Sequence, residues 1–67
     1  MDKITMRAAR VNAGLTQNEI ASLMHVSRAT VVKWEKGYII PKLASFEMFA
    51  RLCGRSTDEI FLPDKVN

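Results

Sequence analysis

The sequence predicts one all-α domain built from five short helices and no strands. Three observations support this fold class. Apolar residues recur at spacings of three and four, residues that cap helices stand before several of these stripes, and a glycine follows three of them. With 67 residues there is room for one small hydrophobic core, so we expect a single domain over residues 1–67.

The first helix is predicted from an apolar stripe near the start of the chain. Its residues stand at positions i, i+4, i+7 and i+11, which form one face of an α-helix: Ile4, Ala8, Val11 and Leu15. Gly14 is placed to end this helix, because glycine adopts the left-handed conformation of a helix C-cap without steric cost.

The second helix begins at a capping box. Thr16 is followed three residues later by Glu19, and in this pattern the hydroxyl and the carboxylate each satisfy a free backbone amide at the helix N-terminus. We expect the helix to end near residue 24. Its inward side chains are predicted to be Ile20, Leu23 and Met24, with the small Ala21 allowing another helix to approach closely.

The third helix follows almost at once. Ser27 is expected to cap it and Gly37 to end it, which places it over about residues 27–36. Only His25 and Val26 separate it from the second helix, and a connection this short makes the two helix axes cross steeply. The pair therefore has the geometry of a helix-turn-helix motif, over about residues 16–37, rather than that of an up-and-down bundle.

Two further helices are predicted after the connection GYIIPK. Pro41 precedes a fourth helix that ends at Gly54, and four of its apolar residues share one face: Phe46, Phe49, Ala50 and Cys53. Ser56 and Glu59 form a second capping box. A fifth helical turn is expected to carry Ile60, Phe61 and Leu62 and to end at Pro63.

The third helix places basic and small apolar side chains on one face. At 100° per residue they fall within an arc of about 140°: Arg28, Ala29, Val32, Lys33 and Lys36. Val31 and Trp34 point the other way, toward the core. An ordinary solvated face would carry Glu and Gln as readily as Lys and would gain nothing from an exposed valine, so this face is expected to contact a partner.

The charge distribution favours an anionic partner. The net charge is +3, and residues 1–42 hold seven Lys and Arg against three acidic residues, whereas residues 43–67 hold three against four. Such an asymmetry is typical of proteins that bind nucleic acid or a membrane surface, although an excess of this size also occurs in proteins that need it only for solubility.

Several classes of function lack support in the sequence. Cys53 is the single cysteine and His25 the single histidine, so there is no metal-binding cluster, and no spacing would assemble a catalytic group. We therefore expect no enzyme, no metal and no cofactor, with Cys53 in the core and His25 in a surface turn. No long apolar segment or secretory signal is present, which favours a cytoplasmic protein without a membrane partner.

The segment TQNEIASLMHVSRATVVKWEKG resembles the helix-turn-helix of the Cro and phage-repressor class, including the wider Xre-type regulators. The similarity runs from about Arg10 to Ile60. It is carried by R…GLTQ, by Ala21 in the first motif helix, by Val26 in the turn, by Val31 and Trp34 inside, and by WEKG…P. This resemblance implies a compact five-helix domain of the lambda-repressor-like helix-turn-helix type.

The sequence departs from the family pattern at two positions. His25 stands where the family usually has Gly, and a left-handed conformation there costs a non-glycine residue about 1 kcal/mol, somewhat less for His. Arg55 stands where the family often has an apolar residue, so the fifth helix is expected to dock differently. Neither departure touches the predicted DNA-binding face.

The resemblance implies that the third helix enters the major groove of DNA with its N-terminal residues at the base edges. Arg28 and Lys33 would donate to guanine, while Ala29 and Val32 would contact the methyl group of thymine. Further residues would contact phosphates: Gln17, Ser27, Lys36, Lys42, and Gly37 and Tyr38 through their backbone. Without the resemblance, the two basic residues could equally belong to a solvated helix surface.

The resemblance also suggests a structural ion pair. Arg10 of the first helix would reach across to Glu35, which borders the core side of the third helix. Glu35 is therefore not expected to contact DNA.

Two functions follow from these features. The first is a sequence-specific transcriptional regulator, Cro-like or repressor-like and derived from a phage or prophage, that binds operator half-sites as a dimer joined through Phe61, Leu62 and Val66. The second is a protein-interaction module on the same fold, such as an anti-repressor or an antitoxin-like partner. The chain length fits both a whole Cro-type protein and the N-terminal domain of a longer repressor.

The second function would use the connection between the third and fourth helices. Tyr38, Ile39 and Ile40 form an apolar run where the family usually has polar or basic residues. The run either tucks under the fourth helix or, if two of the three residues are exposed, forms an interaction site for a partner regulator protein.

Overall fold

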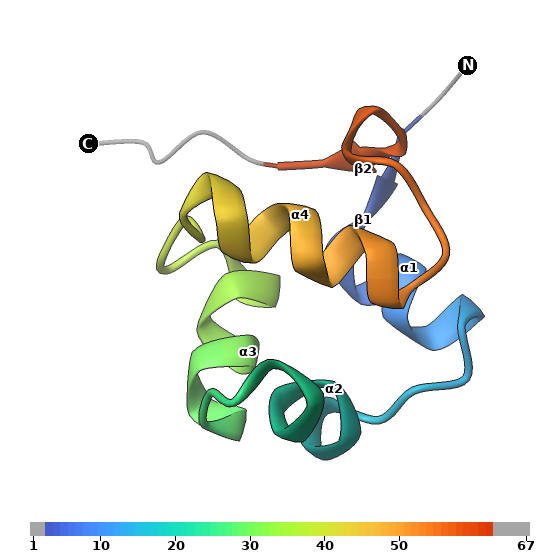
Figure 1. The fold of residues 1–67 in the computed structure, drawn as a ribbon. Coiled ribbons are helices and arrows are strands. Elements are labelled where there is room, and N and C mark those ends of the chain that lie inside the picture. The colour runs from blue at the N-terminus through green and yellow to red at the C-terminus, as the bar shows by residue number, and fades with distance from the viewer. Residues whose placement is uncertain (1–2, 63–67) are drawn as a thin grey trace.

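The computed structural model describes residues 3–62, which form four α-helices, one short 3-10 helix and a pair of two-residue strands (Figure 1). In chain order these are β1 (Ile4–Thr5), α1 (Met6–Asn12), α2 (Gln17–Met24), α3 (Arg28–Lys36), α4 (Leu43–Leu52), η1 (Thr57–Glu59) and β2 (Ile60–Phe61). The all-α class is confirmed. The count of five helices and the expected absence of strands were wrong.

The first helix has a different register from the one predicted. Thr5 caps it by accepting a 3.0 Å hydrogen bond from the backbone N–H of Ala8, so Ile4 lies before the helix, in β1. The buried residues of α1 are Met6, Ala9 and Arg10, while Val11 is exposed. The predicted stripe failed because Ile4 is held by a strand partner and because a buried arginine occupies the inner face. Gly14 has the left-handed φ of 76° that was predicted for it.

The second helix and the turn after it follow the prediction closely. The capping box is present, with Thr16 Oγ1 accepting from the N–H of Glu19 at 3.0 Å and Glu19 Oε1 accepting from the N–H of Thr16 at 2.8 Å. His25 has the predicted left-handed conformation, with φ 58°. Leu23, however, is exposed instead of inward. The narrow buried face of α2 is filled by Ile20, Ala21 and Met24.

The core is built from the buried faces of all four α-helices and from Ile60 of β2. Trp34 of α3 packs edge-on against Phe49 of α4, with ring centroids 6.5 Å apart. The predicted inner face of α4 is confirmed, because Phe46, Phe49, Ala50 and Cys53 are all buried. Burial raises the pKa of the Cys53 thiol, which keeps it neutral at physiological pH.

The predicted fifth helix is mostly absent. The capping box of Ser56 and Glu59 forms, but it supports only the three residues of η1. Ile60 then pairs with Ile4 in a parallel register, and Phe61 pairs with Thr5. Isoleucine and phenylalanine favour strands, and this pairing joins the two ends of the described chain beside α1 (Figure 1). Pro63, where the helix was expected to end, lies outside the described residues.

Candidate nucleic-acid interface

The second and third helices cross steeply, as the short connection predicts. In Figure 1, α2 is seen nearly end-on while α3 runs upright beside it. Ser27 caps α3 by accepting a 3.1 Å hydrogen bond from the N–H of Thr30, and Gly37 ends it with φ 78°. Local capping at both ends therefore fixes the length and the start of the helix that carries the basic face.

The basic face of α3 is largely open to solvent. Arg28, Ala29, Lys33 and Lys36 are exposed, while Val31 and Trp34 on the opposite side are buried. Val32 was expected to be exposed, but the structure leaves it half-buried. Part of its surface still lies on the face between the basic residues, where a thymine methyl group would contact it.

A buried ion pair joins α1 to α3. Arg10 Nε lies 2.7 Å from Glu35 Oε2, and the two side chains are only 9% and 3% exposed. Arg10 Nη1 also donates to the carbonyl of Leu15 at 2.8 Å, which ties the pair to the segment before α2. The structure thus contains the predicted ion pair, and its burial gives it a structural role that holds α3 in place.

Gln17 belongs to the same network, which the sequence did not indicate. Its Nε2 donates to Glu35 Oε1 at 3.1 Å, and Arg10 Nη2 donates to the same oxygen at 3.2 Å. The only sequence signal was the position of Gln17 at the first turn of α2, and that position equally suits a phosphate contact. The phosphate contact stays a prediction, because the amide has a second N–H that this bond leaves free.

The other predicted phosphate-binding groups lie near the ends of α3. Ser27, Lys36, Tyr38 and Lys42 are exposed. The backbone N–H groups of Gly37 and Tyr38 donate to the carbonyls of Trp34 and Lys33, at 3.2 and 2.9 Å. These two amides serve the helix C-cap, so the predicted phosphate contact from the backbone of Gly37 and Tyr38 lacks a free donor.

The connection between α3 and α4 exposes apolar side chains. Tyr38 and Ile39 are exposed, Ile40 is half-buried and Pro41 is buried. Leu43, the first residue of α4, is also exposed, and the sequence analysis did not single it out. Two residues of the apolar run, Tyr38 and Ile39, are therefore exposed, as expected if the run is an interaction site.

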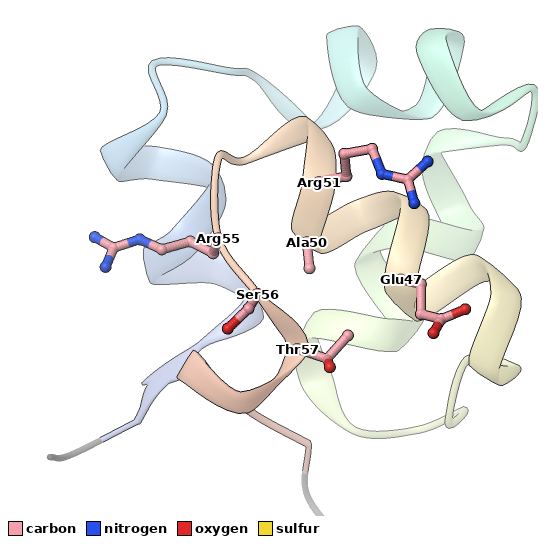
Figure 2. A pocket seen from close by; sticks show the side chains of 6 residues that line it. All are labelled: Glu47, Ala50, Arg51, Arg55, Ser56 and Thr57. Carbon is pink, nitrogen blue, oxygen red and sulfur yellow. The ribbon is translucent and has the colours of Figure 1, made fainter.

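A shallow polar hollow lies between α4 and η1, away from these residues. Figure 2 shows its six lining residues, Glu47, Ala50, Arg51, Arg55, Ser56 and Thr57, around a volume of about 280 Å³. Arg55 extends away from Arg51 and Glu47, and its guanidinium lies 3.6 Å from the carboxylate of Glu59. The polar groups of the hollow therefore do not converge on one point.

In this protein, α2 and α3 cross steeply, and α3 is capped at both ends. One face of α3 is joined to α1 by a buried ion pair, and the other face is exposed and basic. These features define a helix-turn-helix DNA-binding domain. The helix-turn-helix family model matches residues 6–60. An uncharacterized HTH-type transcriptional regulator of Methanothermobacter thermautotrophicus is 38% identical over 61 residues, covering 90% of this chain and 88% of the relative. The chain belongs to the helix-turn-helix family of Cro-like and Xre-type regulators. No solved structure matches it significantly.

This family is a class of DNA-binding transcription regulators and not a class of enzymes. Between residues 3 and 62, no helix is long and apolar enough to cross a membrane.

Proposed function

We propose that this protein is a sequence-specific regulator of transcription that reads operator half-sites in the major groove of double-stranded DNA with α3. The observation that carries the proposal is the exposed basic face at the start of a helix whose other face is held by a buried ion pair. In helix-turn-helix proteins, the N-terminal residues of the second motif helix contact the base edges. A rigidly anchored α3 supports base readout, because hydrogen bonds to bases require accurate placement of the donors.

Each residue of the face has a proposed role. Arg28 and Lys33 donate to guanine O6 and N7, and each good bidentate contact discriminates against a wrong base by about 1–3 kcal/mol. Ala29 and Val32 contact thymine methyl groups. Ser27, Lys36, Lys42 and the second amide N–H of Gln17 hold the flanking phosphates, which position the domain without reading sequence.

The regulator is proposed to act as a dimer on two half-sites about 34–36 Å apart, one turn of the double helix. One domain of this size covers too few base pairs to select a site by itself. Phe61 is exposed beside β1, and Leu62 is half-buried against the core, so both are available at one end of the molecule for a second copy. Val66, the third residue expected there, lies outside the described residues. A Cro-like or repressor-like role in a phage or prophage, in the cytoplasm, fits this assignment.

The test is selection from a randomised duplex library at about 0.15 M salt, the physiological ionic strength. We expect an inverted repeat with a fixed spacing between its half-sites. The same selection with Arg28→Ala should lose preference at particular base pairs. If wild-type protein enriches no sequence, the proposed readout is wrong.

A further inference from the structure

We propose that the connection between α3 and α4 is a docking site for a segment of a partner protein that carries both acidic and apolar side chains. This segment competes with DNA for Lys36 and Lys42. The site is formed by Tyr38, Ile39 and Leu43, called the loop patch below. These side chains are 64%, 42% and 70% exposed, although all three are large and apolar. Figure 1 shows that this connection projects from the opposite end of the molecule to the connection between α1 and α2.

DNA binding does not explain the loop patch. A phosphate is held by hydrogen-bond donors and positive charge, and the side chains of Ile39 and Leu43 provide neither. Their place after the C-terminal end of α3 puts them outside the face that is proposed to read bases. Clustered apolar side chains exposed on a soluble domain more often mark a protein contact.

The charge around the loop patch is mainly positive. Lys36 Nζ lies 5.9 Å from the centroid of the Tyr38 ring, and Lys42 is exposed just before Leu43. Residues 36–46 contain no acidic side chain. Two acidic residues border this stretch: Glu35 is buried against Arg10, whereas Glu47 is exposed on α4, one turn after Leu43. An apolar patch flanked by lysines is therefore complementary to a partner that combines carboxylates with apolar anchors.

The same charge argues against a second copy of this chain as the occupant. A symmetric pair brings the same surface of both copies together, so Lys36 and Lys42 of one copy would face those of the other. The one exposed carboxylate that borders the stretch, Glu47, would offset only one of the two lysines on each copy. An acidic segment removes the repulsion and buries the three apolar side chains as well.

Competition with DNA follows if Lys36 and Lys42 also hold phosphates, and this part of the inference rests on the proposed function. Carboxylates and phosphates would then use the same two cations. A partner bound at the loop patch would displace the regulator from its operator, without needing to cover the base-reading residues.

The probe is a displayed library of random peptides selected on the immobilised wild-type protein at about 0.15 M salt. We expect enriched peptides that combine Asp or Glu with Leu, Phe or Trp. Ile39→Asp and Leu43→Asp should each weaken their binding at least about tenfold. Leu23→Asp is the matched control, because Leu23 is 53% exposed on α2 and lies outside the patch, and it should leave binding unchanged. Thermal melting confirms that each variant is folded.

Two further measurements separate the alternatives. A duplex recovered by the DNA selection should displace a bound acidic peptide. Lys42→Glu should weaken the binding of the peptide at least about tenfold. The docking inference is overturned if no acidic peptide is enriched, if the enriched peptides are neutral, or if Ile39→Asp binds them as well as wild type does. It is also overturned if the protein binds no peptide but binds vesicles of anionic phospholipid, and if Ile39→Asp weakens that vesicle binding at least about tenfold.

The two proposals fail in distinguishable ways. Acidic peptides lost in Ile39→Asp, together with a DNA selection that enriches nothing, would support docking and remove the proposed readout. A DNA selection that enriches an operator, together with no enriched acidic peptide, would support the proposed readout and remove the docking inference.

Discussion

Gln17 and Glu35 are joined by a 3.1 Å hydrogen bond from the side-chain amide of Gln17 to Oε1 of the carboxylate. The bond links the first residue of α2 to α3, inside a network that also holds Arg10. A residue at the expected phosphate-binding end of α2 thus supports the helix that is proposed to read bases.

Replacing Gln17 by Ala should lower the free energy of unfolding by about 1.5 kcal/mol, since the lost bond is made to a charged, shielded acceptor. Urea denaturation measures this change. Asn18→Ala is the control, because Asn18 is the exposed neighbour of Gln17, and it should change stability by less than about 0.5 kcal/mol. If Gln17→Ala weakens DNA binding but leaves stability unchanged, then the amide serves phosphate alone.

Replacing Glu35 by Ala should have a larger effect. It leaves the Arg10 guanidinium buried without its carboxylate, and breaking a buried pair in this way costs about 3–5 kcal/mol. That is a large part of the stability of a small domain. Urea denaturation of Glu35→Ala measures this loss of stability. Glu47→Ala is the control, because Glu47 is an exposed glutamate on α4. The free energy of unfolding should fall by more than the free energy of DNA binding of the folded protein. Equal melting temperatures for Glu35→Ala and wild type would refute a structural role.

The turn between α2 and α3 carries a small strain that can be relieved. His25 has φ 58°, in the left-handed region that disfavours residues with a Cβ atom. His25→Gly should therefore raise the free energy of unfolding by about 0.5–1 kcal/mol. Gly37→Ala, which places a Cβ atom at φ 78°, should shift it in the opposite direction. A lower melting temperature for His25→Gly would mean that the imidazole makes a stabilising contact.

The capping box at η1 should make stability depend on acid pH. Glu59 accepts a 2.9 Å hydrogen bond from the N–H of Ser56, and this bond lowers the pKa of Glu59 below its usual 4.5. The ionised form therefore stabilises the folded state. Its contribution is complete above the usual pKa and is lost as the pH falls through the lowered one.

Melting curves of wild type and Glu59→Gln between about pH 6 and pH 3 test this prediction, because the range spans the usual pKa of a glutamate. The variant should be the less stable protein near pH 6, and the difference should shrink toward pH 3. A difference that is the same at every pH would show that the charge of Glu59 contributes nothing.

The features that could be predicted from residue patterns alone depend on neighbours along the chain, whereas the distant Arg10–Glu35 pair was expected only from the family resemblance. The Thr16 capping box and the Ser27 cap each involve groups within a few residues of one another, while the left-handed His25 was expected from the family resemblance. The inner face of α4 was also predictable, because helix geometry alone places Phe46, Phe49 and Ala50 together.

The features that were missed depend on distant residues. Ile4 pairs with Ile60, and two residues of isolated strand carry no recognisable alternation. The hydrogen bond from Gln17 to Glu35 was missed because the two residues lie eighteen positions apart and on different helices. Leu23 looked like a core residue because its spacing fits the stripe, yet the buried face of α2 consists of Ile20, Ala21 and Met24, and Leu23 is exposed.

The division of the exposed cations into base-reading and phosphate-binding residues gives the sharpest test of the interface. Arg28 and Lys33 lie on the proposed reading face, whereas Lys36 lies at the C-terminal end of α3 beside Tyr38. Arg28→Ala should cost about 1–3 kcal/mol at the preferred site and relax specificity at particular base pairs. Lys36→Ala should weaken all sequences alike and reduce the slope of log affinity against log salt by about one, because one phosphate contact releases about one counterion.

The measurement is a salt titration of each variant on the selected operator and on an unrelated duplex. Arg51→Ala is the matched control, since Arg51 is an exposed arginine in the hollow between α4 and η1 and should change neither specificity nor slope. Because a phosphate contact carries no sequence information, its loss cannot alter the ratio of the two affinities. A ratio that stays constant in Arg28→Ala would therefore place Arg28 on the phosphates and leave α3 without its main reader of guanine.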